Sequence, residues 1–343
     1  MIMIFVVSLL VALIIITTKK FHAKYTADEI IGAQKFHSKI TPRIGGVGIF
    51  LALTAGYLIM PNLNITKLII CLLPVFTAGL VEDISKNVSP FNRLIAAFVS
   101  SLMLFIIFDI SIDVGAEKIQ ILDQNKYIIW IVGVVFLAGM INAINIIDGF
   151  NGLASGVVLI QFSTINYLLN NSENVFLVKT IEIMILAIMG FFVLNFPKGK
   201  IFLGDAGAYM LGFMIAAISI LSISDNKSQQ IIPLIINICY PVYEVMFSII
   251  RKTLREGYHP SKPDGVHLHM LFYKRYFRKL KIKPEYKNSL TSLIFWVYQA
   301  FCSLIAISSE NKSIGFQFFM LIICGLIYHL VYVRMSKFKW KLA

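Results

Sequence analysis

The stretch "NAINIIDGFNGLASG", residues 142–156, decides the fold, because it follows a long apolar run and is itself rich in polar residues and glycine. The run at residues 127–140 suits a membrane helix, yet the residues after it bring three asparagines and an aspartate. Lipid penalises ionisable side chains, and in membrane proteins they are usually functional. We therefore interpret this stretch as the place where a membrane helix reaches a polar site.

The rest of the chain repeats the apolar pattern. Of its 343 residues, 58% are hydrophobic and 14% are charged, whereas a soluble domain carries about 25% charged residues. A helix needs roughly 20 mostly apolar residues to cross the bilayer core. The pattern predicts an all-α, polytopic integral membrane protein with about eleven transmembrane helices, a single transmembrane domain over residues 1–343 and cytoplasmic active-site loops. The predicted spans are 2–18, 44–60, 67–81, 94–111, 127–147, 153–170, 176–195, 206–224, 231–250, 290–307 and 314–333.

The basic residues predict the orientation of these spans. If the N-terminus lies outside, the inner segments hold 25 of the 31 lysines and arginines. Lys and Arg prefer the cytoplasmic side of a membrane, so we expect an outer N-terminus and a cytoplasmic C-terminus. The first span has no basic residue before it and is expected to be a retained anchor. The four cysteines all fall in apolar spans, which favours buried thiols over disulfides or zinc ligands.

With this topology the acidic residues converge on one boundary between membrane and water. They are Glu82, Asp83, Asp148, Asp205 and Asp264. A single carboxylate at a helix end is often a solvated cap. Five of them from four separate stretches, at one depth, predict a functional site on the inner face.

Two of these stretches offer ligands for a hard cation. Asn142, Asn145 and Asp148 are spaced three residues apart and share one ridge of a helix. Their oxygens suit a cation, a sugar or a phosphate. In "FLGDAGAYMLGF", residues 202–213, Asp205 stands at a helix start, where it can cap the helix or hold a cation that bridges to a phosphate.

An adjacent acid pair, Glu82 and Asp83, closes the predicted third span, with Lys86 and Arg93 soon after it. Negative charge at a helix C-terminus is disfavoured, so a nearby cation or an acidic proton would offset the penalty. An adjacent pair can also raise the pKa of one member, which suits it to take a proton.

A basic inner loop, residues 255–275, carries His259, His267 and His269. No cysteine partner stands near them, so zinc is disfavoured and imidazoles that face phosphates fit better. The glycines of "PRIGGVGIF", residues 42–50, are interpreted as helix-packing residues, because no strand precedes them.

These stretches together resemble the polyprenyl-phosphate N-acetylhexosamine-1-phosphate transferase family, in its undecaprenyl-phosphate N-acetylglucosaminyl 1-phosphate transferase branch (glycosyltransferase family 4). "NAINIIDGFNGLASG", "FLGDAGAYMLGF" and "HPSKPDGVHLHM" look like the three most specific signatures, and "RIGG" and "VED" precede them in order. The resemblance implies a bacterial inner-membrane enzyme that depends on Mg²⁺, with Mn²⁺ as a substitute. It would join the sugar phosphate of a UDP-N-acetylhexosamine, first of all UDP-N-acetylglucosamine, to undecaprenyl phosphate and release UMP, as the first membrane step of cell-surface polysaccharide assembly.

The resemblance also implies roles for single residues. It makes Asp205 the principal Mg²⁺ ligand with Asn145 as partner, and it places the catalytic acids Glu82 and Asp83 at the lipid phosphate. Lys86 would lie close to the lipid phosphate as well. Asp148, a third catalytic candidate, would line the nucleotide-sugar site together with Asn142. His267 and His269 would contact the donor's diphosphate or sugar, and Arg251 is a further substrate-binding candidate.

Three positions depart from the family pattern. The acid pair is commonly Asp-Asp, and the longer arm of Glu82 suits proton removal better than covalent attack, while Asp83 stays open between base and nucleophile. Met270 stands where many relatives have a further histidine. Glu244 stands where Asp is frequent, and pairing with Arg251 is one hypothesis for its role.

Two other functions compete with this interpretation. An intramembrane aspartyl protease would need a Gly-x-Gly-Asp sequence, but position 202 is Phe. A polytopic transporter of a lipid-linked or phosphorylated sugar would show ionisable residues at mid-membrane and related halves, and no matching half is visible. We expect no nucleic-acid partner, and the oligomeric state, a homodimer included, stays open.

Overall fold

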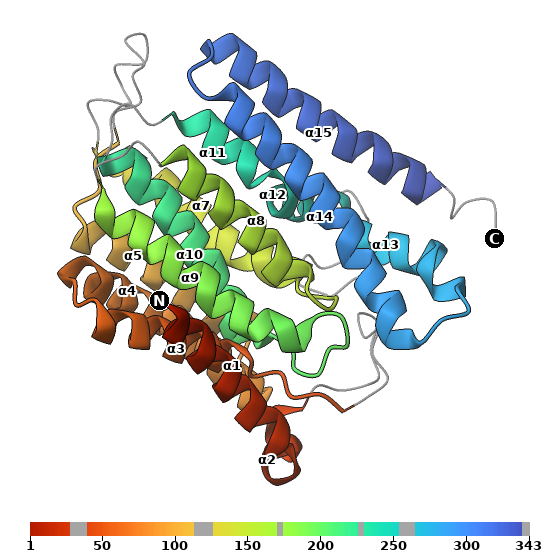
Figure 1. Cartoon of the computed structure of the whole chain (residues 1–343). Helices are drawn as coiled ribbons and strands as arrows, with labels where there is room; N and C mark the ends of the chain where they lie inside the picture. Colours follow the sequence, from red (N-terminus) through yellow and green to blue (C-terminus); the bar gives the residue numbers. More distant parts are fainter. Residues whose placement is uncertain (28–39, 113–125, 170–173, 226–229, 254–264, 338–343) are drawn as a thin grey trace.

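The computed structural model describes residues 1–27, 40–112, 126–169, 174–225, 230–253 and 265–337, and within these ranges it is helical, without a β-strand. Ala27 and Pro42 form an isolated bridge. Figure 1 shows the helices as one bundle of long rods. They are α1 (Ile2–Thr17), α2 (Lys19–Thr26), α3 (Gly46–Ile59), α4 (Leu63–Ser85), α5 (Pro90–Ile107), α7 (Lys126–Ile147), α8 (Leu153–Leu168), α9 (Val175–Asn195), α10 (Gly204–Asp225), α11 (Ile231–Asn237), α12 (Cys239–Thr253), α13 (Leu268–Arg275), α14 (Pro284–Ser309) and α15 (Ile314–Lys337), with a short 3₁₀ turn at Phe277–Lys279.

The predicted polytopic membrane protein is confirmed, and each predicted apolar segment lies on a helix or a bent pair of helices. Among the described residues, seven helices are long and apolar enough to cross a membrane, and nine spans result if each bent pair counts as one. The bends are 89° between α1 and α2 and 73° between α11 and α12. Two of the eleven predicted segments, α3 and α8, are apolar but short, with 14 and 16 residues.

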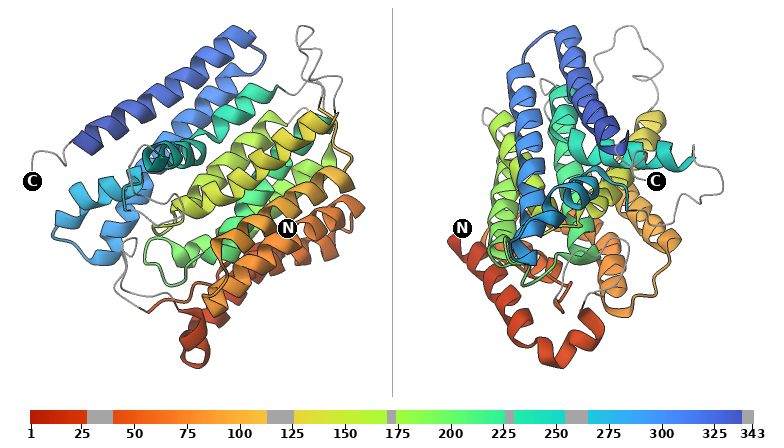
Figure 2. Two further views of the ribbon diagram at one scale, coloured as in Figure 1. Left: turned by 180° about the vertical axis from the view of Figure 1, so that it is seen from behind. Right: turned by 90° about the vertical axis from the view of Figure 1, so that its right-hand side faces the viewer.

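Helix α10 forms the centre of the bundle. Of its apolar window 94% is buried, against 17% for α15 at the edge. It packs against α7, α4 and α3, and both views in Figure 2 place α15 on the outside. Helix α10, which has no charged residue in its middle, is therefore shielded from lipid by its neighbours. The exposed apolar side chains of the outer helices suit the hydrocarbon of a bilayer.

Four helices bring their ends together at one end of the bundle, which we call the site end. Helices α4 and α7 finish there, and α5 and α10 begin there. The backbone amide of Asp205 donates to Asp83, and the Asp205 carboxylate accepts from Arg93 and Asn145. At the opposite end, Lys126 at the start of α7 pairs with Asp109 after α5. For the four acidic residues that the structure describes, Glu82, Asp83, Asp148 and Asp205, the predicted convergence at one end therefore occurs in the fold.

Close backbone contacts fix the start of α10. A Cβ atom on Gly79 of α4 would lie 2.6 Å from the Cα atom of Ala206, so only glycine lets the two helices approach this closely. Gly204 has a φ of +76°, a left-handed conformation that favours glycine. The amide of Gly45 donates to the carbonyl of Phe202 at 2.9 Å, so the "RIGG" segment runs beside the start of α10 and packs there, as expected.

Candidate active site

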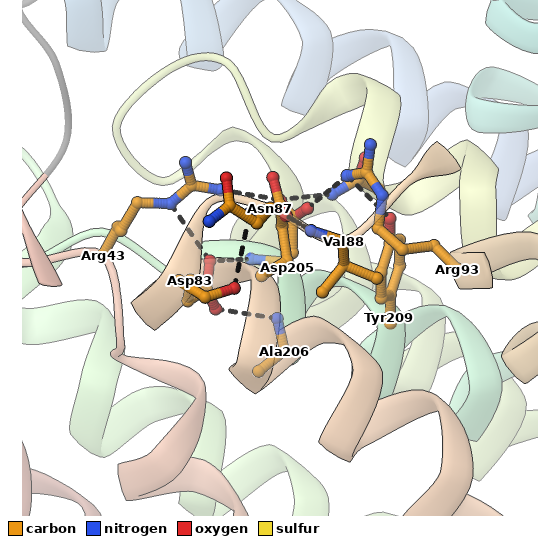
Figure 3. Close-up of polar contacts among 11 residues, drawn as sticks. Arg43, Asp83, Asn87, Val88, Arg93, Asp205, Ala206 and Tyr209 are labelled. Atoms are coloured by element: carbon orange, nitrogen blue, oxygen red, sulfur yellow. Dashed lines mark hydrogen bonds and ion pairs between the residues drawn. The ribbon is translucent and has the colours of Figure 1, made fainter. Parts of the chain in front are cut away.

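Asp205 lies in the first turn of α10 and holds two arginines. Arg43 Nη2 donates to Oδ1 at 2.9 Å, and Arg93 Nη1 donates to Oδ2 at 2.7 Å (Figure 3). Asn145 Nδ2, from the end of α7, donates to Oδ1 at 3.2 Å. The Asp205 side chain is 12% exposed and the two arginines 18% and 21%. Two guanidinium groups at the rim of a membrane bundle make a site that can accept phosphate oxygens.

Asp83 lies behind this site and is fully buried, at 0% exposure. Its Oδ1 accepts the backbone N–H of Asp205 at 2.8 Å, and its Oδ2 accepts that of Ala206 at 3.0 Å. Arg43 Nε donates to Oδ1 at 3.0 Å. The first amides of a helix lack intrahelical partners, so Asp83 caps α10 from the neighbouring helix α4. Asp205 does not cap its own helix, and its carboxylate is left for side-chain partners.

Glu82 lies in a different environment from its neighbour Asp83. It is partly exposed, its Oε2 accepts the amide of Val88 at 2.9 Å, and it lies within electrostatic reach of Arg93. Lys86 ends α4 in a left-handed conformation, with φ of 57°, and its side chain is exposed. The acid pair is therefore split between one buried and one accessible carboxylate, a difference that residue order alone did not show.

The two asparagines near the end of α7 make different contacts: one reaches the site, and the other bonds within its own helix. Asn145 reaches Asp205, whereas Asn142 Nδ2 donates to the carbonyl of Ala138 at 2.8 Å, one turn back in its own helix. Asp148, three residues after Asn145, is partly exposed at the same end. The structure thus brings Asn145 and Asp205 together directly, with Asp148 close along the chain.

The second half of the stretch 142–156 connects α7 and α8 to helix α14. The amide of Asn151 donates to Asn288 Oδ1 at 2.6 Å, and Trp296 Nε1 donates to the carbonyl of Gly152 at 3.1 Å. Gly152 has a φ of +74°, which makes the sharp exit from α7 into α8. These contacts attach helix α14 to the loop that follows Asp148, so this half of the motif keeps Asp148 in place.

A second polar cluster combines α12 with the start of α13. Glu244 accepts from His267 Nδ1 at 3.1 Å and lies 3.3 Å from His269 Nδ1. All three side chains are buried, at 1%, 3% and 0% exposure. Burial lowers the pKa of His269 below its ordinary value. Arg251, the hypothetical partner of Glu244, donates instead to the Tyr332 hydroxyl at 2.7 Å, and it fastens α12 to α15.

The structure adds three charged residues that the sequence interpretation did not assign to the site. Arg43 and Arg93 hold Asp205, and Glu244 holds the two histidines. Their sequence signals were weak, since Arg43 precedes a glycine pair and Arg93 stands in an ordinary first helical turn. Asp264 and His259 lie outside the described residues.

The polar residues at Asp205 fit a magnesium ion that takes some of its ligands from the protein and the others from a substrate. Among the described residues no three His, Cys, Asp or Glu side chains are grouped as a protein cage for a metal. Mg²⁺, however, is usually held by one or two carboxylates together with waters and substrate phosphates. Asp205 offers one carboxylate, and Asn145 turns its nitrogen to Asp205, so its oxygen is directed elsewhere.

Comparison with known proteins gives concordant matches. Residues 65–223 match the family described as glycosyl transferase family 4. A "Probable undecaprenyl-phosphate N-acetylglucosaminyl 1-phosphate transferase" of Bacillus subtilis is 30% identical over 77% of this chain and 75% of its own length. An "Undecaprenyl-phosphate alpha-N-acetylglucosaminyl 1-phosphate transferase" of Thermotoga maritima is 27% identical over 71% and 72%. A "Phospho-N-acetylmuramoyl-pentapeptide-transferase" of Dictyoglomus turgidum is 31% identical over 55% of this chain and 62% of its own length.

Proposed function

The chain belongs to glycosyl transferase family 4, and from this premise we propose that it transfers N-acetylglucosamine 1-phosphate from UDP-N-acetylglucosamine to undecaprenyl phosphate and releases UMP. The names of its relatives from Bacillus subtilis and Thermotoga maritima support this acceptor and this sugar. The product would be the lipid-linked sugar on which a cell-surface polysaccharide is built.

One observation carries the proposal: Arg43 and Arg93 converge on Asp205 at the site end of the bundle. Both substrates carry phosphate groups, and their mutual repulsion must be overcome before they can react. Guanidinium groups bind phosphate oxygens in a fixed fork geometry. The two arginines are partly exposed, so they can exchange Asp205 for a phosphate without unfolding the helices around them.

The reaction needs an oxygen nucleophile and a stabilised leaving group. An oxygen of the acceptor phosphate attacks the phosphorus that carries the sugar, a new P–O–P linkage forms, and the bond to UMP breaks with its electron pair. Glu82 acts as the base that removes a residual proton from the acceptor phosphate, because it is the accessible member of the acid pair. Asp83 acts through α10, which it caps, and positions Asp205.

Asp205 would hold Mg²⁺ together with the donor's diphosphate, and Asn145 would join them by turning its amide so that the oxygen faces the ion. The ion, when bound, neutralises the charge that develops on the leaving UMP. Arg43 and Arg93 then turn from Asp205 to the phosphates, and they keep the two anions in contact. Lys86, exposed at the end of α4, adds positive charge where the acceptor phosphate arrives.

The site end faces the cytoplasm in this proposal, with the N-terminus outside. The basic residues of the inner segments support this orientation, since Lys and Arg favour the cytoplasmic side. The nucleotide sugar would reach the site from the cytoplasm, and the polyprenyl tail would lie along the apolar outer helices.

Purified protein in detergent or lipid, with undecaprenyl phosphate and a panel of UDP-sugars, tests the proposal. Mass spectrometry of the lipid fraction should show one sugar phosphate added per lipid, with an equal amount of UMP released. Asp205→Asn should remain folded and lose this activity. Transport of a sugar into vesicles without UMP release would replace the proposal with the transporter alternative.

A further inference from the structure

The cluster of Glu244, His267 and His269 is arranged around one buried carboxylate. Glu244 Oε2 lies 3.1 Å from His267 Nδ1 and 3.4 Å from the backbone nitrogen of Leu268, and Oε1 lies 3.3 Å from His269 Nδ1. The two imidazole rings are parallel within 3°, with centroids 5.5 Å apart. One acid on α12 therefore sets the direction of both rings at the start of α13.

The position of the protons follows from the carboxylate. An ionised carboxylate only accepts hydrogen bonds, and a buried one is costly without donors. The Nδ1 atoms that face Glu244 must therefore carry hydrogen. The Tyr240 hydroxyl, also 3.3 Å from His269 Nδ1, can then serve only as a second acceptor.

The opposite nitrogen of His269 is left with a lone pair. Burial lowers the pKa of His269, which opposes a second proton on the ring. Its Nε2 atom is buried and has no hydrogen-bond partner among the described residues. Phe150 and Phe295 make T-shaped contacts with the ring, with centroids 5.7 and 6.1 Å from its own.

This nitrogen lies against Gly149, in the middle of the stretch 142–156. A Cβ atom built on Gly149 would lie 3.8 Å from His269 Nε2, and that atom is its nearest neighbour. Gly149 directly follows Asp148 and has no side chain, so the bare nitrogen faces the loop between α7 and α8, next to Asp148. A buried acceptor without a partner is costly within the protein, and a ligand that donates a hydrogen bond would remove that cost.

We infer that Glu244 is a positioning residue that holds His269 with an unprotonated Nε2 toward Gly149, where it accepts a hydrogen bond from the hexosamine part of the donor, a hydroxyl or the acetamido N–H. An ionised diphosphate has no hydrogen to give, and a lone pair facing it would repel it. The phosphates are thereby assigned to Arg43 and Arg93, and the sugar to His269. The identity of the ligand rests on the proposed function, whereas the protonation state does not.

Solid-state ¹⁵N NMR of the full chain in lipid, with ¹⁵N-labelled histidine and no substrate, tests the protonation directly. The chain has six histidines, and His269→Gln identifies the resonances of His269 by their loss. We expect a protonated Nδ1 and an unprotonated Nε2 in the wild-type protein. A proton on Nε2, whether in the other tautomer or in a charged ring, would overturn the inference even if the enzyme were fully active.

Kinetics with altered donors test the ligand. His269→Ala should raise KM for the UDP-sugar about tenfold, the effect of one lost hydrogen bond, with little change in KM for undecaprenyl phosphate. For the one donor analogue that lacks the bonded hydroxyl or N–H, wild type and His269→Ala should have the same KM. If the loss in His269→Ala is the same with every analogue, the contact with the sugar is disproved.

A pair of substitutions separates positioning from folding. Glu244→Asp keeps the carboxylate and should retain the Nδ1–H form of His269, whereas Glu244→Gln should mix the tautomers and raise the donor KM. Glu182→Gln, at an ion pair with Lys179 in another helix, is the matched control and should change neither. Wild-type tautomers in Glu244→Gln would show that Glu244 does not set them.

Discussion

The carboxylate of Asp83 accepts a hydrogen bond from the backbone amide of Asp205 at 2.8 Å, so one acid of the site holds the helix that carries the other. The same carboxylate also accepts from Ala206 and from Arg43. This arrangement divides the work of the acid pair, because Asp83 is enclosed and Glu82 is accessible.

Removal of the Asp83 carboxylate should act on stability as well as on rate. Asp83→Ala removes the acceptor of two amides of α10 and of the Arg43 Nε–H, which costs about 1–3 kcal/mol for each buried group left unpaired. We expect a clearly lower midpoint of thermal unfolding in detergent, together with lost UMP release. A variant that unfolds like wild type would show that α10 does not depend on this cap.

Substitution of Glu82 should act on rate alone. Glu82→Asp keeps an accessible base on a shorter arm and should retain measurable turnover, whereas Glu82→Gln should lose about 10²-fold or more. Both proteins should unfold at the wild-type temperature, since Glu82 caps no helix. Initial rates of UMP release give the comparison, and equal activity of the glutamine variant would remove the base from the scheme.

Much of the fold could be predicted from the sequence because the apolar spans are local features. Each predicted segment lies on a helix, and the alternation of spans placed Asp148 and Asp205 at one end without any coordinates. The bends at Thr18 and Ile238 were not predicted, because apolar composition runs through the α11–α12 break and does not mark it.

The partners of the site residues depend on which helices meet, so they could not be predicted. Arg43 reaches Asp205 from 162 positions away along the chain because the "RIGG" segment pairs with the start of α10. The sequence suggested Arg251 as a partner for Glu244, because the two residues share one face of a helix about two turns apart. The start of α13 brings two histidines to Glu244 instead. The division of labour between Glu82 and Asp83 likewise follows from the position of α10.

Close packing at Gly79 predicts a contrast between two glycines. Gly79→Ala would put a methyl group 2.6 Å from the backbone of Ala206, so we expect a displaced α10 start, lower thermal stability and lost activity. Gly139 in α7 has nothing within 4 Å of the same position. Gly139→Ala should therefore be neutral or stabilising by about 0.5–1 kcal/mol. The midpoints of thermal unfolding of the two variants test this contrast. Equal midpoints would disprove the argument that close packing at Gly79 requires glycine.

The proposed orientation can be tested with single cysteines in a variant lacking the four native ones, all of which are buried. Lys198 is exposed at the site end and Lys312 is exposed at the opposite end. In intact cells, a maleimide that cannot cross membranes should label Lys312→Cys and leave Lys198→Cys unlabelled until the cells are opened. The reverse pattern would turn the site end outward.

The two arginines on Asp205 predict that metal binding depends on the substrate. Both carboxylate oxygens are engaged by Arg43 and Arg93, so a divalent cation meets two positive charges at its ligand. We expect the protein alone to bind Mn²⁺ weakly, and to bind it at least about tenfold more tightly when UDP-N-acetylglucosamine is present. Electron paramagnetic resonance measures both affinities.

Arg93→Gln should strengthen Mn²⁺ binding to the substrate-free protein and make that binding depend less on the donor. Asp205→Asn should abolish Mn²⁺ binding with and without the donor. EDTA should stop turnover and Mg²⁺ should restore it. Equal Mn²⁺ affinity in wild type and Arg93→Gln without donor would show that the ion pairs do not compete with the metal.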